Sequence, residues 1–278
     1  MTDALEIVGL FKEAFWGSLI IALGCSVLGV YIVLRRIVFV SAALAQLSSA
    51  GIALAVFLEG WGLGLGIVGE LGVSLLVTLL GVLFFALHGS RYRVPPDAGL
   101  GIAYVVAGAV GVLLIAKTAG ADAHELFLQG NILGIRGDDV VLLAGVVTAI
   151  LLLHILLYKE FLFISFDPEM ARTMGYGVAA WNLLLFLTFG VVIAVAMQSA
   201  GVLLVFNFLV LPAVTGLLLG GSMRSVFAWA AASGVIAAAA GFALSVPFDL
   251  PTGPAIIAVS GVGVFKAWLF RLFVPQAA

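Results

Sequence analysis

The stretch FDPEMARTMGYG, Phe166 to Gly177, is a short polar segment in the middle of a very apolar chain. Asp167 is suited to the N-cap of a helix, because its carboxylate can accept a hydrogen bond from a backbone N–H of the first turn. Pro168 fits the first helical position, and Glu169 complements the positive end of the helix dipole. The pattern predicts a helix of about two turns that starts after Asp167.

The other end of this segment is equally well marked. Arg172 lies toward the negative end of the helix dipole, and Gly175 and Gly177 can each supply the left-handed residue that ends a helix. Isolated helices shorter than about 12–15 residues are marginal in water. A helix this short therefore needs a partner to pack against.

Met170, Ala171 and Met174 offer an apolar face to that partner, at positions i, i+1 and i+4. Methionine adapts its shape to an irregular groove, which favours a protein as the partner. The alternative is a helix lying on lipid headgroups, but so small an apolar face on a nearly neutral segment would bind a bilayer weakly. We expect the segment to dock on another protein.

The rest of the chain has the composition of a polytopic membrane protein. It has 278 residues, of which 64% are hydrophobic and 9% are charged, and its mean hydropathy is +1.31. Soluble domains are about 45–50% apolar and about 25% charged. The net charge of −2 predicts neither nucleic-acid binding nor a polybasic surface that binds a membrane.

A helix that crosses a bilayer needs about 20 apolar residues. Dividing the chain at its charges, prolines and glycine clusters predicts nine such helices, but the sixth and seventh are separated only at Gln198–Gly201, so the count is eight or nine. Pro212 is expected to break or kink the seventh. The nine segments are Phe15–Leu34, Ile37–Leu58, Leu71–Leu87, Ala98–Ala116, Val140–Tyr158, Val178–Met197, Ala200–Gly220, Ser225–Val246 and Pro251–Phe270.

Basic residues set the expected orientation, because cytoplasmic loops of membrane proteins are enriched in Lys and Arg. With the N-terminus outside and the C-terminus cytoplasmic, nine of the 12 basic residues are cytoplasmic. The segment Phe166–Gly177 is then cytoplasmic as well. The nine are Arg35, Arg36, Arg91, Arg93, Lys159, Arg172, Arg224, Lys266 and Arg271, which leaves Lys12, Lys117 and Arg136 outside.

The segment resembles the coupling helix of permease subunits of ATP-binding-cassette (ABC) importers, in particular those of the zinc/manganese/iron-type family. Further patterns similar to that family occur in the family's order and together cover most of the chain. They are GVYIVLRRIVFVSAALAQLSSAGIALA (Gly29 to Ala55), DAGLGIAYVVAGAVGVLL (Asp97 to Leu114), LFLQGNILGI (Leu126 to Ile135), GVLLVFNFLVLPAVTGLLL (Gly201 to Leu219) and FDLPTGPAIIAVSG (Phe248 to Gly261).

The resemblance implies an all-α bundle of the kind found in vitamin B12 and siderophore importers, formed by residues 1–278 as a single transmembrane domain. It implies a multi-pass protein of a prokaryotic inner or plasma membrane, which pairs with a second copy of itself, two ATPase subunits and an extracytoplasmic substrate-binding protein. The coupling helix would lie at about 167–176. The residues that would contact the ATPase are Phe166, Asp167, Pro168, Glu169, Met170, Ala171, Arg172, Met174 and Gly175.

The chain carries no G-x-x-x-x-G-K-[ST] phosphate loop, so it is not expected to bind and hydrolyse ATP in the P-loop manner. We therefore expect no cofactor in this chain and no enzymatic activity of its own. ATP and Mg²⁺ would belong to the separate ATPase subunit.

The cargo that the resemblance implies is a divalent metal ion, such as zinc, manganese or iron, or a metal chelate. The family commonly has Asp and His four residues apart in the second span, and both look like ligands on the metal path. Those positions are Ala42 and Gln46 here. Alanine offers no ligand atom, and an amide is a poor ligand for zinc. The metal ligands are therefore unknown, and an organic solute remains an alternative cargo.

Neutral polar residues are the candidates for the translocation path: Gln46, Ser48 and Ser49 in the second span, and Asn207 and Pro212 in the seventh. Buried amides in a membrane face protein or a path, because an unpaired amide is costly in hydrocarbon. The alternative is that these groups form hydrogen bonds between helices, worth about 0.6 kcal/mol each.

Two other classes of function are less well supported. An ion-coupled carrier usually has ionisable groups at membrane depth, but the predicted span centres have none, and Lys266 is close enough to the end of its span to snorkel. An intramembrane enzyme would need a nucleophile with a base, or a metal site. Cys25 has no evident partner, and the histidines do not cluster.

Overall fold

The computed structural model describes residues 11–62, 66–88, 96–118 and 132–273. Arg91, Arg93 and most of the LFLQGNILGI pattern lie outside these residues. The described ranges form helices and no strand. The elements are α2 (Lys12–Leu34), α3 (Val38–Gly60), α4 (Gly66–His88), α5 (Pro96–Thr118), η1 (Ile132–Gly134), α7 (Gly137–Leu156), α8 (Tyr158–Phe166), α9 (Pro168–Thr173), α10 (Val178–Leu219), α11 (Met223–Ser245) and α12 (Thr252–Phe273).

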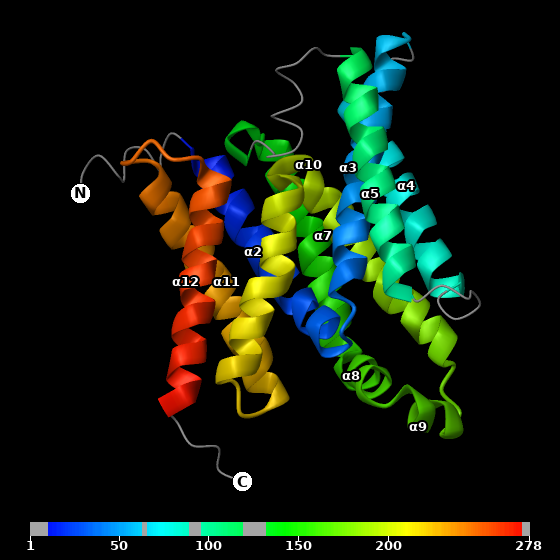
Figure 1. The fold of residues 1–278 in the computed structure, drawn as a ribbon, viewed down its shortest axis with the longest axis vertical. Helices are drawn as coiled ribbons and strands as arrows, with labels where there is room; N and C mark the ends of the chain where they lie inside the picture. The colour runs from blue at the N-terminus through cyan, green and yellow to red at the C-terminus, as the bar shows by residue number, and fades with distance from the viewer. Residues whose placement is uncertain (1–10, 63–65, 89–95, 119–131, 274–278) are drawn as a thin grey trace.

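The long helix α10 doubles back on itself. As a straight helix, its 42 residues would measure about 63 Å, twice the roughly 30 Å of a bilayer core. Near its start, Asn182 accepts a hydrogen bond from Arg35, which follows α2. Near its end, Leu217 packs against the same small cluster as Leu34. Both ends of α10 therefore lie at the same end of α2, and Figure 1 shows the helix rising from α9 and returning beside α11.

The reversal occurs at Gly201. Its backbone angles, φ 74° and ψ 166°, leave helical geometry and lie in a region that is essentially restricted to glycine. The halves on either side, residues 178–200 and 202–219, are each about 27–35 Å long, enough to cross a bilayer. The expected division at Gln198–Gly201 is confirmed. The expected break at Pro212 is wrong: this residue lies inside the second half, which keeps helical geometry.

Eight of the helices in the described ranges are long and apolar enough to span a membrane, with α10 counted once. Its two halves bring the crossings to nine, as predicted. The helix limits differ from the predicted spans by a few residues, because charged residues such as Lys12 and Asp138 are accommodated in terminal turns. The all-α expectation is confirmed.

The core of the bundle surrounds α2, which packs against α7, α10 and α11. Close approach of backbones requires glycine at two of these contacts. A side chain at Gly29 of α2 would collide with the backbone of Leu209 in α10, and one at Gly241 of α11 would collide with the backbone of Ile256 in α12. Packing of small residues drives helix association in lipid.

The helices α3, α4 and α5 pack together on one side of this core, and α11 and α12 lie on the other side (Figure 1). The short helix α9 projects at the end of the bundle where α2 and α12 terminate. The elements α8 and α9 thus join the two membrane-crossing helices α7 and α10 outside the bundle.

Candidate functional site

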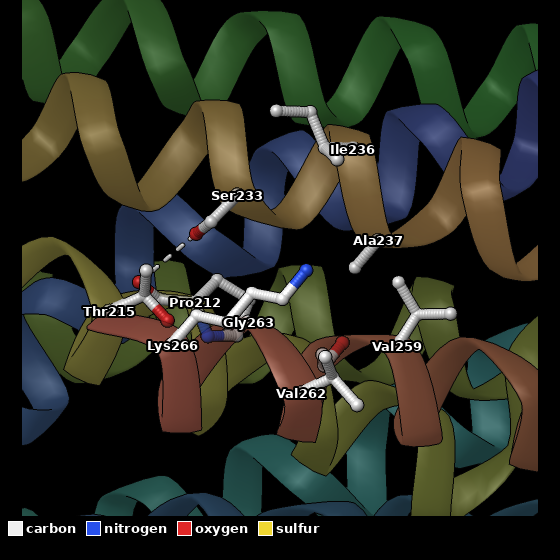
Figure 2. Close-up of a pocket in the computed structure, with 10 residues that line it drawn as sticks. Pro212, Thr215, Ser233, Ile236, Ala237, Val259, Val262, Gly263 and Lys266 are labelled. Atoms are coloured by element: carbon white, nitrogen blue, oxygen red, sulfur yellow. Dashed lines mark hydrogen bonds between the residues drawn. The ribbon is translucent and has the colours of Figure 1, made fainter. Parts of the chain in front are cut away.

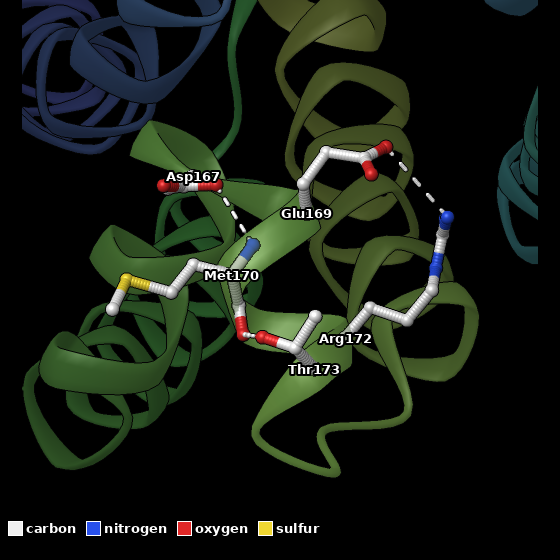
Figure 3. Close-up of polar contacts among 5 residues, drawn as sticks. All are labelled: Asp167, Glu169, Met170, Arg172 and Thr173. Carbon is white, nitrogen blue, oxygen red and sulfur yellow. Dashed lines mark hydrogen bonds and ion pairs between the residues drawn. The ribbon is translucent and has the colours of Figure 1, made fainter.

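The helix α9 has the start that its sequence predicts. Asp167 Oδ1 accepts a hydrogen bond from the backbone N–H of Met170 over 2.8 Å, and Pro168 occupies the first turn (Figure 3). Glu169 forms an ion pair with Arg172 at 3.7 Å. Both partners of this pair are exposed, so it contributes little to stability. The capped carboxylate is the contact that fixes where the helix begins.

The other end of α9 is closed by a Schellman motif. The backbone N–H of Tyr176 donates to the carbonyl of Ala171 over 3.0 Å, and that of Gly175 donates to Arg172 over 3.1 Å. Gly175 has the left-handed φ of 86° that this motif needs. Gly177 has φ −73°, so the expectation that it too could be left-handed is wrong.

The apolar residues of α9 are divided between two faces, which corrects the single face that the sequence predicted. Ala171 is completely buried and belongs to the hydrophobic core cluster of the bundle. Met170 and Met174 are 55% and 64% exposed, and Phe166 just before the helix is 60% exposed. One small residue anchors the helix, and the larger apolar side chains remain on the outside.

The helix α8 anchors this projecting segment to the bundle through Phe161. The Phe161 side chain is completely buried, and its ring lies 4.6 Å from that of His154 in α7 and 6.1 Å from that of Tyr31 in α2. Trp181, at the start of α10, packs edge-on at 5.9 Å. One side chain therefore contacts the three membrane helices that meet above α8.

A second link lies beside it. Arg35 Nη2 donates to Asn182 Oδ1 over 2.7 Å, and the guanidinium lies 5.9 Å above the ring of Phe186. Burial lowers the pKa of Arg35, although a guanidinium stays charged in proteins. The turn between α2 and α3 is thus held to the first half of α10.

The predicted path residues of α3 have different surroundings. Ser48 and Ser74 of α4 share a hydrogen bond of 2.8 Å. For Ser48, this is the alternative considered from the sequence, a hydrogen bond between helices. Gln46 is buried beside Gly108 of α5, where a Cβ would lie 3.4 Å from its Oε1. The Oγ of Ser49 is buried without a hydrogen-bond partner among the described residues.

Asn207 and Pro212 lie on the second half of α10. Asn207 Nδ2 donates to Ser260 Oγ in α12 over 3.1 Å, and its buried Oδ1 has no partner among the described residues. The carbonyl of Pro212 accepts from Ser233 of α11 over 3.4 Å. The described contacts of Asn207 and Pro212 run to α11 and α12, while Gln46 lies at α5, so one copy of the chain does not gather these polar groups into one site.

The described residues hold no group of three or more His, Cys, Asp or Glu side chains that could bind a metal ion. Ala42 and Gln46 are both 8% exposed on α3. These two positions are therefore buried and uncharged, and only Gln46 carries a polar side chain.

Sequence reasoning missed several residues that the structure places at these contacts: Tyr31, Arg35, Ser74, Phe161, Trp181 and Ser260. Each makes its contact with a helix that is distant in sequence. Arg35 carried a usable signal, because a charge at the end of an apolar span needs a partner when the next span follows within three residues.

Comparison with known proteins decides the family. The sequence profile of the ABC 3 transport family matches residues 8–271. The chain belongs to the ABC 3 transport family. It is therefore a multi-pass membrane subunit of an ABC transporter.

Relatives in this family include manganese transport proteins. The manganese import system permease protein ScaB of Streptococcus parasanguinis is 30% identical over 94% of this chain and 90% of its own length. The manganese transport system membrane protein MntC of Halalkalibacterium halodurans is 29% identical over 96% of this chain and 89% of its own length.

Two solved structures share the fold of this permease. PsaBC from Streptococcus pneumoniae in complex with Fab matches with a TM-score of 0.84 and 24% identity, over 99% of this chain and 96% of that chain. An inward-facing putative metal-chelate type ABC transporter matches with a TM-score of 0.75 and 16% identity, over 92% and 85%. The expected likeness to ABC importer permeases is confirmed at the level of the fold.

Proposed function

We propose that this chain is the permease subunit of an ATP-driven importer of a divalent metal, carried as the ion or as a chelate. The permease relatives named for manganese transport supply the cargo class. The observation that carries the ATP-driven part is α9, a helix capped at both ends that projects from the bundle with exposed Met170 and Met174. The permease is non-catalytic, and a separate subunit binds ATP with Mg²⁺ and hydrolyses it.

Two copies of this chain, treated as one transmembrane domain each, would pair and hold two ATPase subunits. When ATP draws the ATPases together, each α9 moves with the groove that holds it. Phe161 passes this displacement from α8 to Tyr31 of α2, and the short Ala171 contact keeps α9 attached. Relative movement of α2 and α10 then opens the path on one side of the membrane and closes it on the other.

The orientation follows from the basic residues. The α9 end carries six of the described basic residues, which are Arg35, Arg36, Lys159, Arg172, Arg224 and Arg271. That end is cytoplasmic under the positive-inside rule, with the C-terminus, and the N-terminus is outside. The membrane is the prokaryotic inner or plasma membrane, and an extracytoplasmic binding protein delivers cargo to the opposite end.

The path between the two copies would be lined by the neutral polar groups Gln46, Ser49 and Asn207. Ser49 and Asn207 support this because each has a buried oxygen without a hydrogen-bond partner among the described residues. Such atoms are rare in well-packed protein, and a cargo or its water shell can satisfy them. Ser48 serves the packing of α3 on α4, and the Pro212 carbonyl accepts a hydrogen bond from Ser233.

The test uses this chain co-expressed with its ABC ATPase subunit. Met170→Glu places a charge in the docking face and is expected to lower ATPase co-purification and ATP-dependent ⁵⁴Mn²⁺ uptake by proteoliposomes at least tenfold. Arg224→Glu, an exposed change at the start of α11, is the matched control and is expected to retain both. Full ATPase retention and uptake in Met170→Glu would refute α9 as the docking site.

A further inference from the structure

A cavity of about 260 Å³ lies between the second half of α10 and the helices α11 and α12. Hydroxyl groups line it from all three helices: Thr215 from α10, Ser233 from α11 and Ser260 from α12. The remaining wall is mostly aliphatic, and one charged residue, Lys266 of α12, completes it. The cavity is separate from α9. Asn207 does not line it but donates a hydrogen bond to Ser260, which does.

Lys266 lines this cavity although the residue is exposed, and its side chain does not extend toward the end of its helix. Figure 2 shows its side chain extending past Gly263 toward Ala237. The residue lies about 10 Å inside the C-terminal end of α12, and side chains of a helix tilt toward its N-terminus. The expectation that Lys266 snorkels to the membrane surface is therefore wrong.

The charge of Lys266 has no counterion in the part of the chain that the structure describes. Neither of the two ion pairs found there involves it. Cationic groups at membrane depth are expensive, and they are typically paired or serve a ligand path. Hydroxyl groups beside an ammonium can form a site for a carboxylate. The ammonium supplies the opposite charge, and the hydroxyls can donate hydrogen bonds to the carboxylate oxygens.

We propose that the cavity at Lys266 binds a carboxylate of an anionic metal chelate, so that the cargo crosses as a metal–carboxylate complex. The inference deepens the proposed function and rests on it. Lys266 pairs with the carboxylate. The hydroxyls of Ser233 and Thr215, which donate to carbonyls of their own helices in this structure, rotate to donate to the carboxylate oxygens.

Two observations oppose a bare divalent cation as the cargo of this chain. The described residues offer no cluster of metal ligands, and the helix face at Ala42 and Gln46 is neutral. An ammonium in the cavity repels a divalent cation twice as strongly as a monovalent one at the same distance. A chelate needs no protein ligand on the metal, because its own carboxylates occupy those positions.

A lipid phosphate is the competing occupant, since it is also an anion. Headgroups lie at the ends of the membrane helices, however, and the Lys266 side chain extends toward the middle of α12 (Figure 2). The position of the ammonium therefore favours a solute within the bundle. Lipid binding remains a distinct outcome in the test below.

The first experiment measures binding of ⁵⁴Mn²⁺–[¹⁴C]citrate to the purified permease–ATPase complex by equilibrium dialysis. We expect both labels to bind in equal amounts. Lys266→Gln should weaken this binding at least tenfold, and Lys266→Arg should stay within about threefold of the native chain. Arg271→Gln, a change at an exposed basic residue five positions further along α12, is the matched control and should leave binding unchanged.

Three results would overturn the inference: ⁵⁴Mn²⁺ bound without ¹⁴C, equal binding by native protein and Lys266→Gln, or a phospholipid that co-purifies with the native complex and is lost from the variant.

ATP-dependent uptake separates failure of this inference from failure of the proposed function. Aquo-⁵⁴Mn²⁺ uptake by the native complex that equals its ⁵⁴Mn²⁺–citrate uptake, and is unchanged in Lys266→Gln, would leave the importer standing and refute the chelate. A native complex that hydrolyses ATP but takes up neither form would refute metal import itself.

Discussion

The ring of Phe161 in α8 meets the ring of Trp181 in α10 edge-on, with their centroids 5.9 Å apart and their planes at 88°. Between these two residues in sequence lies the whole of α9. The chain therefore leaves the bundle at α8 and returns to it at α10 through residues that contact each other. Both ends of the projecting segment are therefore tied to the bundle through the Phe161–Trp181 contact, so we expect a movement of α9 to be passed to α8 and α10.

Removing that contact should destabilise the permease. Phe161→Ala leaves a cavity between α2, α7 and α10 and is expected to cost about 3–5 kcal/mol of folding stability. Phe161→Leu fills most of the space and should cost clearly less, while losing the ring contacts. Thermal unfolding of the purified protein measures both. Equal midpoints for Phe161→Ala and the native protein would contradict the assigned role of this side chain as the anchor of α8.

The reversal of α10 should depend on Gly201. Its φ of 74° with ψ of 166° strains any side chain, so Gly201→Ala is expected to cost about 1–3 kcal/mol. Gly145→Ala in α7 is the matched control, because its backbone is helical and a Cβ there meets nothing within 4 Å. The yield of folded protein and its unfolding midpoint should fall for the first variant only. A similar loss in both would mean that the bend tolerates a side chain.

The N-cap of α9 should control docking of the ATPase. Asp167→Ala removes the hydrogen bond to Met170 and is expected to cost about 1 kcal/mol of helix stability, or about a fivefold loss of the docked form. Asp167→Asn keeps an acceptor and should retain docking. Titration of the permease with purified ATPase measures the affinity. The bundle itself should unfold at the same temperature in all three proteins, because Asp167 lies outside it.

Local patterns in the sequence predicted what depends on local contacts. Asp167, Pro168 and Gly175 act through hydrogen bonds and torsion angles within a few residues, so the ends of α9 followed from the sequence. The helix count followed for the same reason, because hydropathy is a property of each segment. The break at Gly201 was placed correctly within a window. The break expected at Pro212 is absent, because neighbouring helices can satisfy the backbone groups that a proline leaves free, and Ser233 donates to the Pro212 carbonyl.

Contacts between distant segments could not be predicted in this way. Phe161 is one of 20 phenylalanines in an apolar chain, and nothing near it in sequence shows that it meets Tyr31. Ala171 was assigned to the face of Met170 by helical spacing, but its burial is decided by the neighbouring helices. Lys266 was expected to snorkel because its distance from the helix end allowed it, while the direction of its side chain depends on the cavity beside it.

The positions Ala42 and Gln46 allow the missing metal site to be restored. The double variant Ala42→Asp/Gln46→His places a carboxylate and an imidazole on one face of α3, four residues apart, where they can hold one divalent cation. We expect the purified double variant to retain Mn²⁺ or Zn²⁺ through gel filtration. The two introduced ligands form one site, so the expected content is about one ion per chain. The native chain and each single variant should retain several-fold less.

The same double variant should change the preferred form of the cargo. A bound bare cation would no longer need carboxylates from a chelator, so the ratio of aquo-⁵⁴Mn²⁺ uptake to ⁵⁴Mn²⁺–citrate uptake should rise at least tenfold over the native ratio. Adding Lys266→Gln should raise it further, because the ammonium that repels the bare ion is then gone. An unchanged ratio in a double variant that does bind the metal would show that α3 does not face the path, and Gln46 would then be a packing residue beside Gly108.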